Sequence, residues 1–73
     1  MSDVRFSDER YRAVARFSKT AWYLSLFSKT DQSSHLYKFP VEPKVRALLE
    51  FFKGKEVAGL VEVLMQIPHE ELR

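Results

Sequence analysis

The residue types that could carry out chemistry are few in this chain, and their spacing does not suit catalysis. The chain has 73 residues, no cysteine and two histidines, His35 and His69. The C-terminal stretch "PHEELR" begins like the zinc motif H-E-x-x-H but has no second histidine. Glu70 and Glu71 are adjacent, and adjacent residues do not face each other on a helix. We therefore expect no enzyme activity, no small-molecule substrate, no cofactor and no metal.

Positive charge is concentrated near the N-terminus. The formal net charge is only +2, which by itself does not imply nucleic-acid binding. The densest basic stretch holds five cations against two acids: Arg5, Arg10, Arg12, Arg16 and Lys19 against Asp8 and Glu9. Arginine is the cation preferred for two-pronged contacts to carboxylate or phosphate. The stretch is either a solvated face or an electropositive contact patch.

Aromatic residues are abundant, with six Phe, three Tyr and one Trp. Most must lie in the core, because aromatic side chains bury the most area. Trp22 and Tyr23 are adjacent, so on a strand one can be buried while the other is exposed. Tyr, Trp and Arg are enriched at interface hot spots. We predict that these residue types form a partner-binding surface. The alternative for Trp22 is that it only anchors the core. The residues of the predicted surface are Arg5, Phe6, Arg10, Arg12, Arg16, Trp22 and Tyr23.

The basic stretch is predicted to be a helix from Ser7 to about Ser18. Ser7 suits a helix N-cap, and Asp8 and Glu9 follow in the first turn, where the helix dipole favours acids. Apolar residues then recur at helical spacing: Tyr11, Val14, Phe17 and Ala21. A strand is the alternative, because "RYRAVARF" also alternates between apolar and charged residues. Ahead of it, "DVRF" could add a short edge strand.

Residues 20–39 are predicted to form a β-hairpin. Two runs rich in aromatic and branched residues flank the polar stretch "SKTDQSS". That loop, residues 28–34, lacks Asn-Gly or Asp-Gly, so we expect it to be mobile. A hairpin alone is marginal in water and must pack against helices.

The C-terminal half is predicted to form a pair of helices. Pro43 suits the first helical position, and Gly54 ends the helix that follows. Apolar stripes mark the two helices: Val45, Leu48, Leu49 and Phe52, then Val57, Leu60, Val61 and Leu64. Gly59 inside the second helix would mark the close approach of another element. The short Gly54 connection makes the two helices an αα-hairpin, and Pro68 ends the second.

This C-terminal pattern resembles a helix-turn-helix, but DNA reading is not expected. The would-be recognition helix from Pro68 to Arg73 spans less than two turns. It carries Glu70 and Glu71, which phosphates repel, whereas phosphate contacts supply most non-specific affinity for DNA.

Together these elements predict one α+β domain over residues 1–73. Its order is an N-terminal helix, a β-hairpin and a C-terminal αα-hairpin. The ends, about 1–6 and 69–73, are expected to be flexible. Without disulfides, the apolar core must supply the stability. No apolar run is long enough to span a membrane, and the acidic N-terminus is not expected to be a signal peptide. The lack of cysteine fits the reducing cytoplasm that we expect.

From "MSDVRFSDERYRAVARF" through the final "MQIPHEELR", and in length, the chain resembles small transcription regulators of lytic bacteriophages that infect Xanthomonas. The resemblance implies a non-enzymatic protein of the host bacterial cytoplasm that binds host RNA polymerase. We expect the protein to be a monomer. It implies contacts with the β′ subunit near its N-terminus and with the β subunit. It also implies displacement of the σ factor, inhibition of initiation, and antitermination. Contact residues do not transfer one by one.

A nucleic-acid-binding protein is the alternative hypothesis. It would use the N-terminal arginines or the C-terminal helix pair, and its affinity would fall steeply with salt. No RNP-type sequence supports RNA binding.

Overall fold

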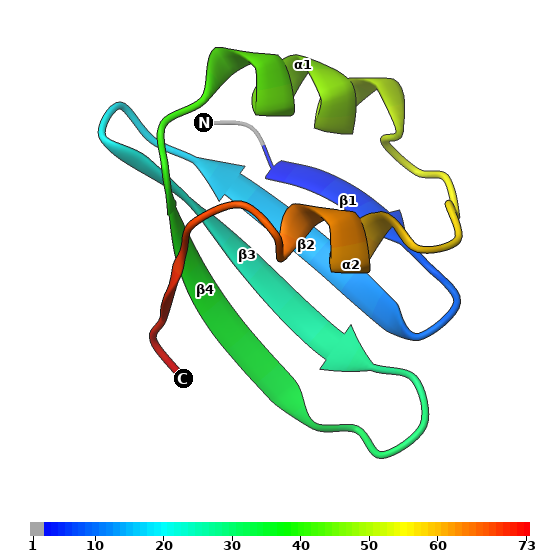
Figure 1. The fold of residues 1–73 in the computed structure, drawn as a ribbon. Coiled ribbons are helices and arrows are strands. Elements are labelled where there is room, and N and C mark those ends of the chain that lie inside the picture. Colours follow the sequence, from blue (N-terminus) through cyan, green and yellow to red (C-terminus); the bar gives the residue numbers. More distant parts are fainter. Residues whose placement is uncertain (1–2) are drawn as a thin grey trace.

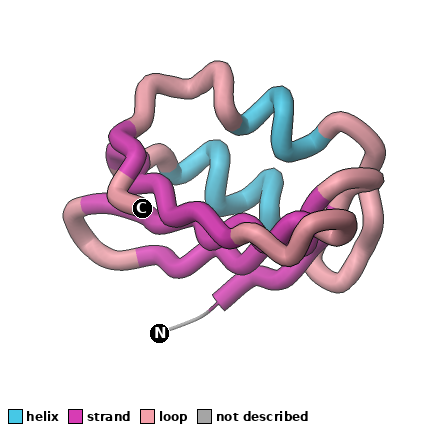
Figure 2. Tube along the Cα trace, turned by 90° about the horizontal axis from the view of Figure 1, so that it is seen from below, coloured by secondary structure: helices cyan, strands magenta, loops and turns pink. Residues whose placement is uncertain are grey.

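The chain folds as an antiparallel sheet with two short helices (Figure 1). This computed structural model describes residues 3–73. The strands are β1 (Asp3–Ser7), β2 (Tyr11–Phe17), β3 (Ala21–Ser28), β4 (Ser34–Pro40) and β5 (Glu70–Glu71), in the spatial order β1-β2-β3-β4-β5. The helices are α1 (Pro43–Phe51) and α2 (Leu60–Leu64). Both helices lie on the same side of the sheet (Figure 2), so the opposite side has no covering element among the described residues.

The predicted α+β arrangement, with an N-terminal helix, a hairpin and a C-terminal αα-hairpin, is wrong. The protein is mainly a five-stranded antiparallel sheet. The segments predicted as flexible ends include β1 and β5, while residues 1–2 lie outside the described part of the chain. No helix within residues 3–73 has the length and apolar character needed to cross a bilayer.

The predicted N-terminal helix is instead β2. Ala13 and Ala15 are buried on one side of the strand, and Arg12 and Arg16 are exposed on the other. The two-residue alternation therefore outweighs the helical spacing. β2 pairs with β1 on one side and β3 on the other. A helix of about 12 residues is marginal without tertiary support, whereas a central strand has both backbone edges paired.

Asp8 and Glu9, which were predicted to lie in the first turn of a helix, instead accept hydrogen bonds in and near the turn between β1 and β2. Asp8 Oδ1 accepts hydrogen bonds of 2.8 Å from the backbone N–H groups of Arg10 and Tyr11, in the turn between β1 and β2. Its Oδ2 accepts from the N–H of Val61 at 3.2 Å, and Glu9 Oε1 accepts from the N–H of Gly59 at 2.8 Å. These acids thus satisfy N–H groups at the start of α2, far along the chain.

The predicted hairpin is present as β3 and β4, paired from Ala21–Pro40 to Phe27–Ser34. Its loop is held by local hydrogen bonds. Asp31 Oδ1 accepts from the Ser33 N–H at 3.0 Å and from the Ser33 hydroxyl at 2.8 Å. These bonds, with a smaller contribution from the Ser28 hydroxyl, lower the pKa of Asp31 to about 2.

The predicted αα-hairpin is wrong, although its first helix is present as α1, with Pro43 in the first turn. α2 has only five residues, and residues 52–59 run beside β1 before it. Ser7 donates its N–H to the Lys55 carbonyl at 3.0 Å and accepts from the Val57 N–H at 2.8 Å. Gly59 has φ 77° at the N-cap of α2, and a Cβ there would meet nothing within 4 Å. Glycine is therefore favoured at position 59 because of its positive φ angle. The prediction that Gly59 marks the close approach of another element is wrong.

The core lies between the sheet and the two helices. Trp22 is 1% exposed and lies between Phe17 and Phe39, with ring centroids 5.6 and 4.1 Å away. Leu49 of α1 and Leu64 of α2 complete the core from the other layer. This stacked aromatic cluster supplies the burial that a chain without disulfides needs.

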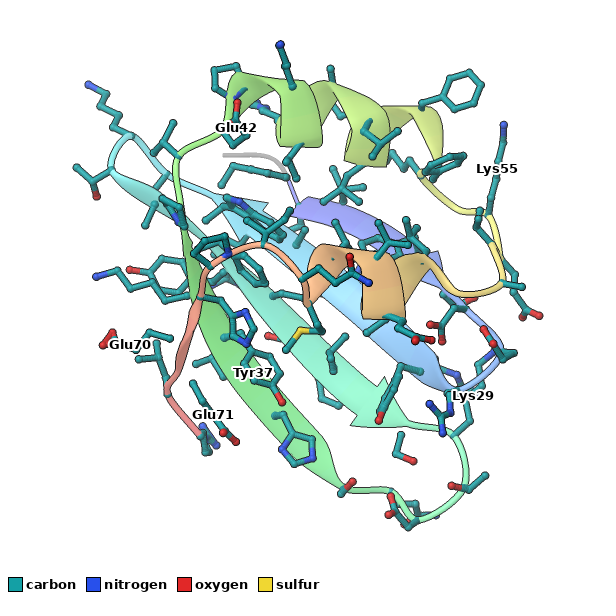
Figure 3. The ribbon with its side chains drawn as sticks, in the orientation of Figure 1. Lys29, Tyr37, Glu42, Lys55, Glu70 and Glu71 are labelled. Atoms are coloured by element: carbon teal, nitrogen blue, oxygen red, sulfur yellow. The ribbon has the colours of Figure 1, made fainter. Side chains whose placement is uncertain are left out.

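The C-terminal segment pairs with β4, and Tyr37 lies opposite Glu71 in the register (Figure 3). Partial burial raises the pKa of Tyr37 above its usual 10.0, and the negative charge of Glu71 and the neighbouring Tyr11 add to this effect. The folded state therefore holds the phenolic proton more tightly than the unfolded state does. The stability linked to this group is complete below about pH 10 and falls as the pH rises through the folded pKa.

Replacing Tyr37 with phenylalanine is expected to remove this alkaline sensitivity. The thermal midpoint of the wild type should fall more between pH 9 and pH 11 than that of Tyr37→Phe, because the variant has no phenol to ionise. Thermal unfolding followed by circular dichroism across this range measures the difference. Parallel pH profiles for the two proteins would contradict the assignment.

Candidate interaction surface

The side of the sheet away from the helices, called the open face below, is formed by the residues that alternate with the core positions. β1 contributes Asp3, Arg5 and Ser7; β2 contributes Arg12, Val14 and Arg16; β3 contributes Tyr23, Ser25 and Phe27; β4 contributes Ser34, Leu36 and Lys38. None of these residues is buried, whereas their alternating neighbours on the first three strands include most of the core. A solvated face is common in antiparallel sheets, and this one is accessible to a partner.

The open face is predominantly basic. Arg5, Arg12, Arg16 and Lys38 are all exposed. The Asp3 carboxylate lies 3.5 Å from Arg16 Nε, but the Arg16 side chain is still 65% exposed. An ion pair this exposed contributes little to stability. The three arginines are exposed, and the ion pair leaves Arg16 accessible to a partner.

Two arginines on this face lie directly across from aromatic residues. The β2–β3 register places Arg12 opposite Phe27 and Arg16 opposite Tyr23, and Val14 opposite Ser25 lies between these pairs. Directly opposed side chains on one face of a sheet lie within contact range. The face thus presents two arginine–aromatic pairs in a row.

The open face has two depressions. One, called the tyrosine pocket, has a volume of about 360 Å³ and is lined by Val14, Arg16, Tyr23, Ser25 and Leu36. The other, called the basic groove, has a volume of about 950 Å³, and its lining includes Arg5, Arg12, Val14, Phe27, Lys29 and Lys55. Val14 lines both and so marks the boundary between them.

Four of the seven predicted partner-binding residues come together on the open face: Arg5, Arg12, Arg16 and Tyr23. Arg10 lies in the turn between β1 and β2, at the end of the sheet. Phe6 and Trp22 are 4% and 1% exposed and belong to the core on the helix-covered side. We therefore drop both from the proposed surface, and Trp22 is the core anchor that was the alternative interpretation.

Sequence reasoning missed several residues of this surface, among them Phe27, Leu36, Lys38 and Lys55. For Phe27 the signal was present, because it alternates with the apolar positions Leu24 and Leu26 once residues 21–28 are a strand. Lys55 had no such signal. It reaches the groove through the pairing of residues 52–59 with β1, which local pattern does not reveal.

A smaller apolar patch lies on the helical layer. Leu48 and Phe51 of α1 are 42% and 69% exposed. Lys55 Nζ lies 4.9 Å from the centroid of the Phe51 ring. This patch is on the side of the sheet opposite the tyrosine pocket, so substitutions there serve as matched controls for substitutions on the open face.

The helix pair invoked for nucleic-acid binding does not form, because α2 is short and residues 70–71 form β5 rather than a third helix. That alternative retains only its N-terminal arginines. Compared with protein-family models, curated proteins and solved structures, the chain has no significant match. Its fold and surface are those of a small β-rich domain with one covered face and one bare face that is basic and aromatic.

Proposed function

We propose that the protein is a non-enzymatic bacteriophage regulator that binds host bacterial RNA polymerase in the host cytoplasm. Two things support this: the resemblance over the whole chain, and a bare surface suited to protein contact. The regulator would engage the β′ subunit near its N-terminus and also the β subunit. By occupying this site it would displace the σ factor and inhibit initiation, and it would act as an antiterminator.

The observation that carries the proposal is the tyrosine pocket. Arg16 and Tyr23 are opposite each other on adjacent strands, and Leu36 completes the pocket with an apolar side chain. Arginine and tyrosine are the residue types that dominate interface hot spots. The sheet holds their backbones rigidly, so little conformational entropy is lost on binding. The pocket is thus a preformed anchor site for a protein partner.

The surrounding cations would steer the encounter. Arg5, Arg12 and Lys38 lie on the same face as the pocket and are exposed. A basic surface accelerates association with an acidic one, and the acceleration weakens with salt. We therefore expect the pocket to fix affinity and the cations to set the association rate.

A native-gel and pull-down titration tests the proposed function. The wild-type protein is mixed with polymerase core, with σ-containing holoenzyme and with bare promoter DNA. A stable complex with polymerase, loss of σ and no shift of bare DNA are the expected results. If the protein at micromolar concentration bound neither core nor holoenzyme, the proposal would be wrong.

Charge reversal on the open face is expected to slow polymerase binding. In Arg12→Glu/Arg16→Glu we expect the association rate at low salt to fall by about tenfold or more, because steering accounts for rate differences of this size. Surface plasmon resonance at two salt concentrations measures the rate. Lys19→Glu/Lys44→Glu, which changes the net charge equally at a turn and on α1, is the control. Equal slowing in both variants would show that net charge, not the open face, governs association.

A further inference from the structure

We propose that the basic groove binds a short single-stranded nucleic-acid segment, with the phosphates on its cations and one base stacked on Phe27. This ligand is distinct from the protein partner proposed for the tyrosine pocket. The inference does not depend on polymerase binding, since a single strand can be offered to the isolated protein.

The groove is assembled from three parts of the chain. Arg12 of β2 lies opposite both Ser7 of β1 and Phe27 of β3. The segment after α1 forms the outer wall, held to β1 by the backbone hydrogen bond between the Ser7 N–H and the Lys55 carbonyl, 3.0 Å long. Lys29 lies toward the end of the sheet where β1 turns into β2, whereas the Lys55 side chain extends from the segment after α1 toward the helical layer (Figure 3). The groove thus combines an exposed aromatic ring with a cation directly across from it on the neighbouring strand.

The charges of the groove leave a net excess of free cations. Lys29 Nζ lies 3.0 Å from Glu56 Oε1 and 2.7 Å from the Asp8 carbonyl oxygen, so this pair largely neutralises itself. Glu56 is the acidic residue in the groove lining. Lys55 Nζ lies over the Phe51 ring of α1, 4.9 Å from its centroid, so Arg5 and Arg12 are the cations that remain to contact phosphate. Two cations correspond to a salt dependence of about −1.4 in log K against log salt for a single strand.

Phe27 favours a single strand over other polyanions. Phe27 is 45% exposed, and it is the exposed aromatic residue in a groove whose lining also includes Arg5 and Arg12. Exposing a phenyl ring costs free energy, and a base offers it a flat apolar surface to stack on. A duplex keeps its bases stacked inside, so it cannot use this ring. An acidic peptide segment would use the cations but gain no stacking.

Fluorescence anisotropy with labelled 12-nucleotide oligo-U and oligo-dT tests the proposal on the wild-type protein. We expect a dissociation constant of about 100 μM or tighter at low salt, because non-specific binding lies between about 1 and 100 μM at physiological salt and strengthens as salt falls. Binding of either strand, with the predicted salt slope, supports the proposal. A lack of binding to both strands at 100 μM protein and low salt overturns it.

Variants separate stacking from charge. Phe27→Ala is expected to weaken binding about 5- to 100-fold, the usual effect of removing one stacking ring. Arg5→Gln/Arg12→Gln should reduce the salt slope by about 1.4, whereas Lys19→Gln/Lys44→Gln, outside the groove, should leave it unchanged. Circular dichroism verifies that each variant is folded. Unchanged affinity in Phe27→Ala, or equal competition by a poly-glutamate peptide, would show that the groove is only a general anion surface and would overturn the proposal.

Discussion

Replacement of Trp22 with alanine is expected to remove most of the protein's free energy of unfolding at 25 °C. Trp22 is 1% exposed and is stacked between Phe17 and Phe39. Removing a large buried aromatic side chain costs about 3–5 kcal/mol, because the cavity does not fully collapse. A domain this small has a thin stability margin, with native stabilities starting at about 5 kcal/mol. Urea denaturation followed by circular dichroism measures the loss.

The matched control is Trp22→Phe. The indole N–H of Trp22 has no hydrogen-bond partner within the described residues. Phenylalanine removes this buried donor and keeps an aromatic ring in the stack, so we expect a stability loss of less than about 1.5 kcal/mol. If Trp22→Ala were as stable as the wild type yet failed to bind polymerase, Trp22 would be a contact residue rather than a core anchor.

Replacement of Asp8 with alanine is the second substitution with a large expected effect. Asp8 is 2% exposed, and its carboxylate accepts from three backbone N–H groups, those of Arg10, Tyr11 and Val61. Alanine leaves these donors without their acceptor. Hydrogen bonds to a charged group are worth about 1.5–3 kcal/mol each, and the losses overlap. We expect a total loss of about 3 kcal/mol in the free energy of unfolding.

Asp8→Asn separates the contribution of the turn hydrogen bonds from that of the bond to Val61. The amide oxygen can still accept from the turn N–H groups of Arg10 and Tyr11, but the amide nitrogen would face the N–H of Val61 as a second donor. Its stability loss should therefore be clearly smaller than that of Asp8→Ala. Asp31→Ala, which removes an exposed carboxylate from a similar turn, should change stability little. Equal losses in Asp8→Ala and Asp31→Ala would contradict the bridging role of Asp8.

The N-terminal half shows why the sequence favoured the wrong element. In "RYRAVARF" the apolar residues satisfy both a helical and a strand spacing, and the acids at Asp8 and Glu9 match a helix cap. The decisive partners are distant: β3 pairs with β2, and Gly59 and Val61 bind the two acids. Local pattern contains none of these contacts. Tertiary pairing therefore decided between two locally acceptable conformations.

Other elements were predictable from local signals alone. α1 begins at Pro43 and carries a regular apolar stripe, and β3 and β4 flank a polar loop. The open face was predictable in part. Once residues 11–17 form a strand, Arg12 and Arg16 fall on one side together, and the adjacency of Trp22 and Tyr23 separates core from surface. Lys55 was not predictable, because a long-range pairing brings it to the groove.

The central claim is that the open face binds the polymerase. Measuring the affinity of the Tyr23→Ala variant for polymerase core tests this claim most directly. Tyr23 lines the tyrosine pocket, whereas Leu48 is exposed on the opposite layer. Both variants are verified as folded, and their dissociation constants are measured by titration with purified core. We predict that Tyr23→Ala weakens binding by about 30-fold, as for a hot-spot residue, and that Leu48→Ala changes it less than about twofold. The reverse pattern, with Leu48→Ala weakened and Tyr23→Ala unchanged, would place the interface on the helical layer and contradict the claim.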